Sequence, residues 1–265
     1  MISRRTFFAG ACCALPTGAF GAPSRLPFLC ATPDAGDHEP GRVGHTKSGS
    51  FPLVGATLDP SQLWRQEDGA TPHTGLITLN VCFLNGTRAD HDLVRQIAPQ
   101  WTHGRLGRRI AFKFGVRASA SHIRVKFRGG GASVSEVGRD NLKKTPDRRT
   151  MNLSVVDHRD ILHEFGHALG LKHEHQHPTS GIRWNKPVVL RDLKQRAHWT
   201  KAMVEENIFK HFSKNCTCIG DPKPDPLSIM LYPIDPTWTL DGRGTHYNTK
   251  LSKRDVGCLE REYKA

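Results

Sequence analysis

Three histidines and one glutamate stand at fixed intervals in the segment HEFGHALGLKH, which begins at His163. On a helix, His163 and His167 lie one turn apart on the same face, so both imidazoles can reach a single metal ion. Glu164 can then act as general base on a water molecule held there. Gly170 permits a sharp turn that brings His173 back as a third ligand. Three protein ligands leave a fourth position open, which is typical of a catalytic zinc site.

The alternative interpretation of this segment is a histidine-rich surface helix without a metal. Short HExxH matches alone can mislead, but the extension to Gly170 and His173 makes the pattern specific. We therefore predict one Zn²⁺ ion per chain. The CxC pair at 216–218 is not expected to hold a second zinc, because no second pair of ligands lies nearby.

The extended motif resembles that of the metzincin zinc endopeptidases, and Glu174 after the third histidine resembles the astacin subfamily. The resemblance implies a methionine turn beneath the zinc, and the run SIMLY at 228–232 fits it. It places Met230 as a structural floor and Tyr232 as a catalytic group that stabilises the oxyanion and can serve as a fifth zinc ligand. Leu231 departs from the histidine common in the family without affecting these roles. Taken alone, the run is typical of a buried strand with a core methionine.

The segments before the motif are expected to form the sheet and helices that position it. Apolar and β-branched patterns predict strands at 76–84, 110–114, 123–127, 132–138 and 150–156. Apolar residues at helical spacing from Leu93 to Trp101 predict an amphipathic helix, and Asp157 is placed to cap the helix that carries the motif. By resemblance, the strand at 132–138 is the sheet edge along which a peptide substrate lies as an added strand.

Beyond His173 the composition shifts to Pro, Trp, Lys and Asp, with helices expected near 204–212 and 255–263. The resemblance implies an α+β metzincin zincin-like fold. Its parts are a mixed twisted sheet, an active-site helix above the cleft, and a smaller, mostly irregular or helical lower subdomain. We assign residues 75–265 to this catalytic domain.

The amino terminus predicts export. Residues 1–22 have two arginines followed by an apolar run that is too short to span a bilayer, which is typical of a signal peptide. The SRRxF sequence resembles the bacterial twin-arginine signal, with an ordinary Sec signal as the alternative. Both predict a secreted or periplasmic protein without stable membrane insertion.

Residues 23–74 show little periodicity and are expected to form a linker or pro-segment. Astacins are commonly held latent by a pro-segment aspartate on the zinc. The resemblance therefore makes Asp59 and Asp68 candidates for that part, although no family motif marks either one.

Seven cysteines occur, of which two lie in the predicted signal peptide. The remaining odd number cannot all pair within one chain. They are Cys30, Cys82, Cys216, Cys218 and Cys258. Astacins tie the terminal helix to the amino-terminal part of the domain, which makes Cys82–Cys258 a candidate. Either cysteine could equally pair within the 216–218 loop.

The formal net charge is +13, which would attract acidic peptides or a bacterial surface; a solvated basic face is the alternative. Several astacins prefer acidic residues just after the scissile bond, so an acidic protein or peptide substrate is one expectation. No nucleic-acid partner is expected, and we expect a monomer. The function predicted is a secreted zinc endopeptidase. The rival is a catalytically silent, zinc-stabilised binding protein or adhesin, which would have no need of Glu164.

Overall fold

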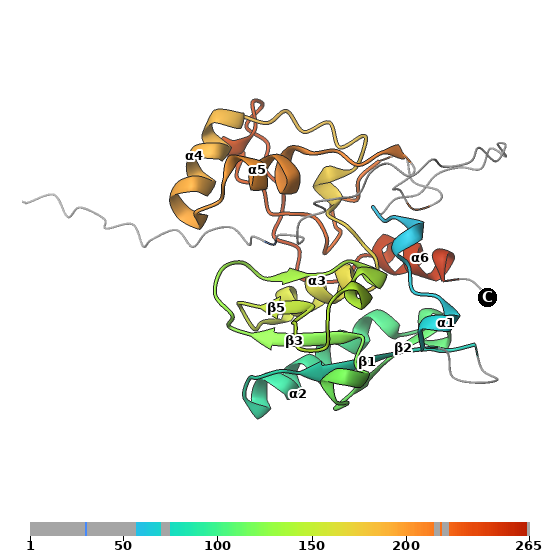
Figure 1. The fold of residues 1–265 in the computed structure, drawn as a ribbon. Coiled ribbons are helices and arrows are strands. Elements are labelled where there is room, and N and C mark those ends of the chain that lie inside the picture. Colours follow the sequence, from blue (N-terminus) through green and yellow to red (C-terminus); the bar gives the residue numbers. More distant parts are fainter. Residues whose placement is uncertain (1–29, 31–56, 70–74, 215–217, 219–222, 264–265) are drawn as a thin grey trace, which may run out of the picture.

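The computed structural model describes residues 30, 57–69, 75–214, 218 and 223–263 (Figure 1). The predicted signal peptide, Cys216 and most of the predicted pro-segment therefore lie outside the described residues. Within these ranges no helix is long and apolar enough to cross a lipid bilayer.

A five-stranded sheet organises the first half of the described chain, with strand order β2-β1-β3-β5-β4. The strands are β1 (Ile77–Phe83), β2 (Ile110–Phe114), β3 (Ile123–Phe127), β4 (Val134–Ser135) and β5 (Met151–Leu153). β2, β1, β3 and β5 run parallel, whereas β4 pairs antiparallel with β5. The sheet is mixed, as predicted, and β4 forms one edge.

β4 is shorter than the strand predicted at 132–138. The side chain of Asn152, rather than a backbone ladder, bonds the chain that leads into it. Its Oδ1 accepts from Gly129 N at 3.0 Å and its Nδ2 donates to Ala132 O at 3.1 Å. The glycine-rich turn is thereby held against β5 without regular strand pairing.

Two helices pack together beside the sheet. α2 (Arg88–Ile97) starts at a capping box formed by Thr87 and Asp90, and the following turn η2 (Ala98–Thr102) carries the buried Trp101. α3 (His158–Ala168) contains the histidine motif and begins at Asp157, whose Oδ1 accepts from the backbone N of Asp160 at 2.8 Å. The predicted cap is confirmed.

The second half of the chain forms a smaller unit on the other side of α3 (Figure 1). It contains α4 (Lys186–Ala197), α5 (Lys201–Val204) and the π-helical turn η7 (Glu205–Phe209). Its own core includes Val189, Leu193, Trp199, Val204, Ile208, Phe209 and Trp238.

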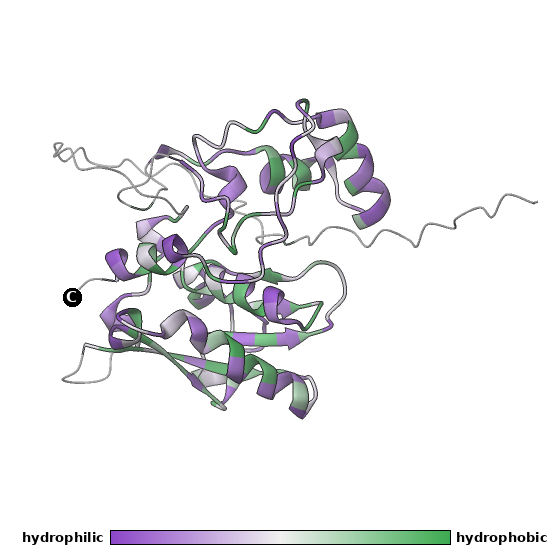
Figure 2. Cartoon of the chain, turned by 180° about the vertical axis from the view of Figure 1, so that it is seen from behind, coloured by the Kyte–Doolittle hydropathy of each residue, from purple (hydrophilic) through white to green (hydrophobic). Residues whose placement is uncertain are grey.

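The helix expected near 204–212 ends at Phe209, and α4 was not predicted. α4 mixes apolar residues with four cations, and Val189 and Leu193 are its buried apolar residues. It is held by tertiary contacts such as the indole N–H of Trp238 on Asp192 at 3.0 Å. In Figure 2, α4 bears both hydrophilic and hydrophobic residues, whereas β1 is largely hydrophobic.

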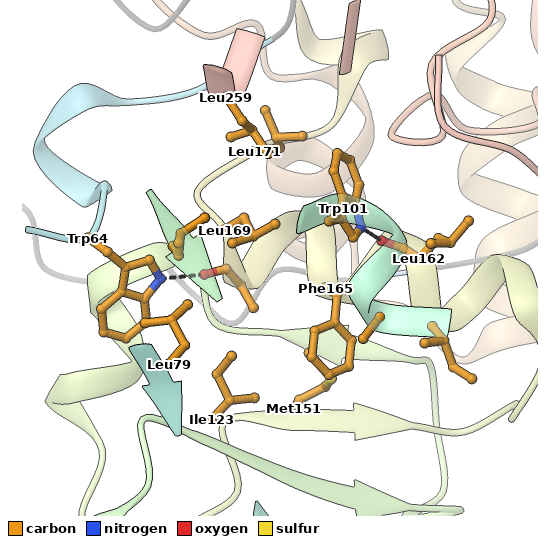
Figure 3. Packing of buried hydrophobic residues seen from close by; sticks show 14 of the residues in the cluster. Trp64, Leu79, Trp101, Ile123, Met151, Leu162, Phe165, Leu169, Leu171 and Leu259 are labelled. Atoms are coloured by element: carbon orange, nitrogen blue, oxygen red, sulfur yellow. Dashed lines mark hydrogen bonds between the residues drawn. The ribbon is translucent and has the colours of Figure 1, made fainter. Parts of the chain in front are cut away.

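The main core lies between the sheet and α3, and two indoles anchor it (Figure 3). Trp101 donates to the carbonyl of Leu162 at 2.8 Å and Trp64 donates to that of Ala168 at 2.7 Å. The side chain of Leu63 lies against Gly170, where an added Cβ would stand 2.7 Å from it. Residues 57–69, within the segment predicted as linker or pro-segment, therefore pack onto the end of α3.

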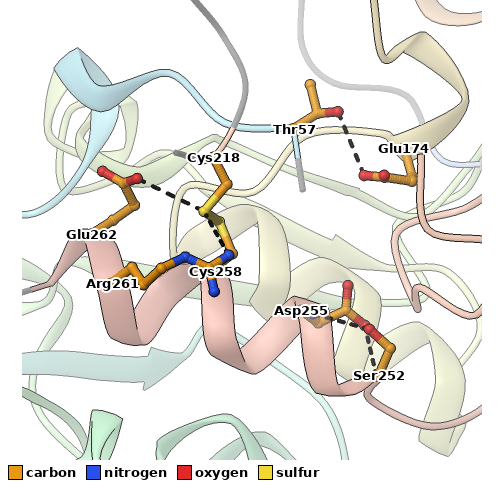
Figure 4. Close-up of a disulfide and its surroundings, with 8 residues drawn as sticks. All are labelled: Thr57, Glu174, Cys218, Ser252, Asp255, Cys258, Arg261 and Glu262. Carbon is orange, nitrogen blue, oxygen red and sulfur yellow. Dashed lines mark hydrogen bonds between the residues drawn. A yellow bond between two sulfur atoms is a disulfide. The ribbon is translucent and has the colours of Figure 1, made fainter. Parts of the chain in front are cut away.

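The terminal helix α6 (Lys253–Glu262) begins earlier than predicted because Ser252 and Asp255 form a capping box. A disulfide joins its Cys258 to Cys218 (Figure 4). The suggested Cys82–Cys258 pairing is wrong. Cys82 is a buried free thiol in β1 that accepts from the Ser121 hydroxyl, whereas Cys258 is bonded to Cys218.

Candidate active site

His163 and His167 project from one face of α3, and a backbone carbonyl orients each ring. Nδ1 of His163 lies 2.9 Å from Ile229 O, and Nδ1 of His167 lies 2.8 Å from Leu171 O. Because a carbonyl oxygen only accepts hydrogen bonds, each Nδ1 carries the proton and each Nε2 keeps a lone pair. Histidine ligands are typically oriented in this way, so both Nε2 atoms are prepared to bind one ion.

His173 joins them from the chain that follows α3. Gly170 has φ 107°, a backbone angle that side-chain-bearing residues adopt only with strain, and the chain turns sharply there. Nε2 of His173 then lies 3.1 Å from Nε2 of His167. All three histidines are fully buried. The turn predicted at Gly170 thus brings the three imidazoles together.

Cys30 supplies a fourth donor that the sequence analysis did not assign to this site. Its Sγ lies 3.5 Å from Nε2 of His167, and the donor atoms of the cysteine and the three histidines all lie within 4.8 Å of one another. Tetrahedral zinc bonds of about 2.0–2.3 Å place neighbouring donors roughly 3.3–3.7 Å apart. The separations of 3.1 and 3.5 Å are close to this range. Three imidazoles and one thiol therefore fit a zinc ion in chemistry and in spacing.

Burial keeps these histidines neutral, which is the form that binds metals. It lowers the pKa of His163 and His173 well below the ordinary value, and that of His167 to about 4. Burial also raises the pKa of the Cys30 thiol, and the neighbouring Glu164 carboxylate raises it further. A bound cation would reverse the effect on the thiol, because coordination deprotonates it.

Glu164 lies on α3 next to His163 and is fully buried. Burial raises the pKa of its carboxyl group well above the ordinary value, while the neighbouring Cys30 thiol opposes that shift. A carboxylate with a raised pKa takes up a proton readily, as a general base must. A carboxyl group thus lies beside a set of side chains that could hold a metal ion.

Met230 packs directly beneath α3. An added Cβ on Gly166 would stand 2.5 Å from the Met230 sulfur and 2.9 Å from Cζ2 of Trp101, so only glycine permits this close approach. Met230 itself is buried. The methionine thus lies under the helix turn that separates His163 from His167.

The turn that carries Met230 is held from α6 by Asp255. The Ser228 hydroxyl donates to Asp255 at 2.5 Å, and Ile229 N donates to the other carboxylate oxygen at 2.9 Å. Met230 N in turn donates to the Ser228 hydroxyl at 3.0 Å. The capping carboxylate of α6 therefore also fixes the floor of the site.

Tyr232 lies beside the histidines with its ring fully enclosed. Its ring centroid lies 4.5 Å from that of His173 and 6.3 Å from that of His163. Its hydroxyl oxygen accepts a hydrogen bond from Cys30 N at 2.9 Å. Tyr232 is thus directed at the main chain of the residue whose thiol faces the histidines.

Cys30 also lies at the sheet edge, where its backbone forms a parallel bridge with Ser133 just before β4. The two aspartates considered for this place lie elsewhere. Asp59 caps a short turn and lies 3.9 Å from the ammonium of Lys172, while Asp68 pairs with Arg139 at 2.8 Å. The odd cysteine count was the signal that could have directed attention to a free thiol.

No family model and no curated protein matches this sequence. Among solved structures, one of myroilysin is 30% identical, covers 79% of this chain and 98% of its own, and has a TM-score of 0.68. A crystal structure of myroilysin is 25% identical, with coverage of 96% and 98% and a TM-score of 0.59.

A third similar structure is high choriolytic enzyme 1, a hatching-enzyme zinc protease from the medaka fish Oryzias latipes. It is 18% identical, with coverage of 77% and 94% and a TM-score of 0.50, and so shows likeness of fold. Each of these similarities extends over nearly the whole length of the other chain.

Proposed function

Because this chain belongs to the astacin-like zinc metalloproteases and is a zinc-dependent endopeptidase, we propose that His163, His167 and His173 hold one zinc ion and that Glu164 is the general base. The observation that carries these roles is the buried set of three converging imidazoles with the Glu164 carboxylate beside them. A catalytically silent binding protein is not favoured.

Zinc bound there would polarise the scissile carbonyl and lower the pKa of a water molecule to about 7. Glu164 takes a proton from that water as its oxygen attacks the carbonyl carbon. As the carbon–nitrogen bond breaks, Glu164 delivers the proton to the leaving amine. The raised pKa of its carboxyl group supports this exchange.

Tyr232 is the proposed second catalytic group. Its hydroxyl can donate to the oxygen that becomes negative during attack, and its ring contact with His173 keeps it next to the metal ligands. Coordination of the metal by Tyr232 before substrate binds is part of the same proposal. Met230 has a supporting role, because its packing under Gly166 fixes the distance between α3 and the turn that carries Met230.

The segment that contains Cys30 is proposed to be an inhibitory pro-segment. The Cys30 thiol faces the histidines, its backbone N–H bonds Tyr232, and its backbone pairs with Ser133 at the sheet edge. A substrate would need all three of these places. Cys30 therefore takes the part for which Asp59 and Asp68 were considered, and its removal from the site would activate the enzyme.

We also propose the location, the oligomeric state and the substrate preference of the enzyme. Residues 1–22 direct export, which makes the enzyme secreted or periplasmic, and the chain acts as a monomer. The excess of 38 Lys and Arg over 25 Asp and Glu favours protein substrates with acidic segments. A peptide library that varies the residue after the scissile bond tests this preference, and selection of neutral or basic residues would contradict it.

The central test uses the chain after removal of the Cys30 segment. Gelatin cleavage and zinc content are measured for the unsubstituted enzyme, for Glu164→Gln and for a chelator-treated sample. We expect one zinc per chain in the first two and cleavage only in the first. Glu67→Gln, at an exposed glutamate, is the matched control and should cleave normally. Cleavage by zinc-loaded Glu164→Gln at the normal rate would exclude Glu164 as the base.

A further inference from the structure

His175 is a buried histidine outside the proposed ligand set, and it lies against Tyr232. It is 1% exposed and belongs to the short turn η6 (Glu174–Gln176) that follows His173. Its ring centroid lies 4.4 Å from that of Tyr232 and 5.3 Å from that of His173. Tyr232 and His173 are themselves 4.5 Å apart. The three rings form a closed triangle, so the phenol contacts a metal ligand and His175 together.

The ring of His175 is anchored from the smaller half of the molecule. Its Nε2 lies 2.9 Å from the carbonyl oxygen of Asn207, in the π-helical turn η7. Because that oxygen can only accept, the proton lies on Nε2 and the lone pair on Nδ1. The Trp184 ring meets the imidazole edge-on at 6.2 Å and 87°. The orientation of His175 is therefore set by segments that contain no proposed ligand.

Neither packing nor anchoring alone accounts for a histidine at this place. Nδ1 is buried and has no hydrogen-bond partner among the described residues. Burial of an unpartnered polar atom is unfavourable, so a residue that only filled space would be apolar. A residue that only bonded the Asn207 carbonyl could be a glutamine. Among side chains of this size, histidine joins a flat ring for Tyr232 to a donor that fixes the plane of that ring.

Tyr232 requires such support because it follows the methionine turn outside any helix or strand of the described chain. Its carbonyl accepts from the Thr245 hydroxyl, a contact that holds the main chain but not the side chain. Its hydroxyl now bonds the backbone of Cys30 and would have to turn to the oxyanion once Cys30 leaves. Stabilisation of an oxyanion depends on placing the donor within about 3 Å of it.

We propose that His175 is a positioning residue for Tyr232, whose anchored imidazole forms the wall along which the phenol turns from the Cys30 main chain to the oxyanion of the substrate. The inference rests on the catalytic role proposed for Tyr232. His175 itself touches no reacting atom. It acts only by limiting where the Tyr232 hydroxyl can lie.

The test is a double-mutant cycle in the enzyme freed of the Cys30 segment. His175→Gln keeps a donor for Asn207 but loses the ring, and His175→Phe keeps the ring but loses the donor. Each is made alone and with Tyr232→Phe. The exposed His103 provides the control His103→Gln. Zinc content, kcat and KM on a quenched peptide, and the Kd of a phosphinic peptide that mimics the tetrahedral state are measured for every variant.

We expect Tyr232→Phe to lower kcat roughly 100-fold and to weaken phosphinic-peptide binding, because an oxyanion donor is lost. His175→Gln should lower kcat roughly tenfold at nearly unchanged KM and full zinc content. On the Tyr232→Phe background it should change kcat by less than about twofold, because residues that act through one another are not additive. His175→Phe should give an intermediate loss with the same lack of additivity.

Independent, multiplying effects of the two substitutions would overturn the inference, as would loss of zinc in both His175 variants. The proposed role of Tyr232 fails in a different way. If Tyr232→Phe is as active as the unsubstituted enzyme, the catalytic role of Tyr232 is wrong. The inference about His175 is then wrong as well, but the assignment as a zinc endopeptidase is unaffected. If His175→Gln does not fold, His175→Phe carries the same comparison.

Discussion

The sulfur of Cys30 lies 3.5 Å from Nε2 of His167, although 137 positions separate the two residues in the sequence. The same residue donates its backbone N–H to Tyr232 and pairs with Ser133 at the sheet edge. One residue thus meets the proposed metal site, the proposed oxyanion donor and the proposed substrate edge. Inhibition and catalysis are therefore expected to compete for the same atoms.

The first prediction concerns this competition. Full-length Cys30→Ala should cleave gelatin without prior processing, at a rate at least roughly tenfold above that of the unsubstituted full-length chain. The tethered thiol competes at high effective concentration, and its loss opens the metal position. Cys82→Ser is the matched control, because Cys82 is also a buried free thiol but lies in β1. Equal activity of Cys30→Ala and the unsubstituted chain would contradict the proposed latency.

The second prediction concerns the floor of the site. Gly166→Ala should destabilise the fold by about 1–3 kcal/mol, because the new methyl group would overlap the Met230 sulfur and the Trp101 ring. This cost outweighs the gain of roughly 1 kcal/mol that alanine brings to a helix interior. Urea unfolding of the two proteins measures the difference.

Gly257→Ala provides the matched control, since it also replaces a helical glycine. Its added Cβ would meet only the guanidinium end of Arg261, at 3.4 Å. That variant should be neutral or more stable by up to about 1 kcal/mol. If both substitutions stabilise the protein, close packing between α3 and Met230 is not what requires Gly166.

The third prediction concerns pH. Burial raises the pKa of Asp160 to about 7, against an opposing hydrogen bond from the Ser133 hydroxyl at 2.7 Å. The folded state therefore holds this proton at pH values where the unfolded chain has lost it. The contribution of Asp160 to the free energy of unfolding falls as pH rises from about 4 to about 7.

Asp160→Asn should remove this dependence, which we expect to amount to roughly 1–3 kcal/mol across that window. The buried histidines act in the opposite direction, because their lowered pKa values cost stability as pH falls. The quantity to compare is therefore the difference between variant and unsubstituted protein in urea unfolding at pH 5 and 7.5. Asp92→Asn, at an exposed carboxylate, should leave the pH dependence unchanged.

The fourth prediction concerns the start of the catalytic domain, assigned from sequence to residue 75. Trp64 donates to Ala168 O and its backbone N–H donates to the Tyr263 hydroxyl, so Trp64 ties the segment 57–69 to the core. Trp64→Ala should cost about 3–5 kcal/mol, and a chain that begins at residue 75 should be still less stable. Arg65→Ala, at the exposed neighbour, should change stability by less than about 0.5 kcal/mol. Intact-mass analysis of the activated enzyme should find its first residue between 31 and 57.

The amino-acid sequence by itself determined the parts of the protein that depend on short-range geometry. The spacing of His163 and His167 matches one helical turn, and Asp157 caps the helix that carries both residues. Gly170 allows the chain to turn back so that His173 approaches them. The strand β1 follows equally from a local run of apolar and β-branched residues, and β2 and β3 follow from local alternation. These features are readable because a helix turn or a strand face repeats every few residues in any fold.

Only the tertiary structure decided which distant residues meet at the site. Four contacts join segments that no local sequence period connects. They are Cys30 with His167, Cys218 with Cys258, His175 with Tyr232, and Trp64 with α3. α4 was missed for the same reason, since its place is set by tertiary partners such as Trp238. Contacts of this kind depend on burial and on the path of the whole chain, and neither is encoded in the spacing of neighbouring residues.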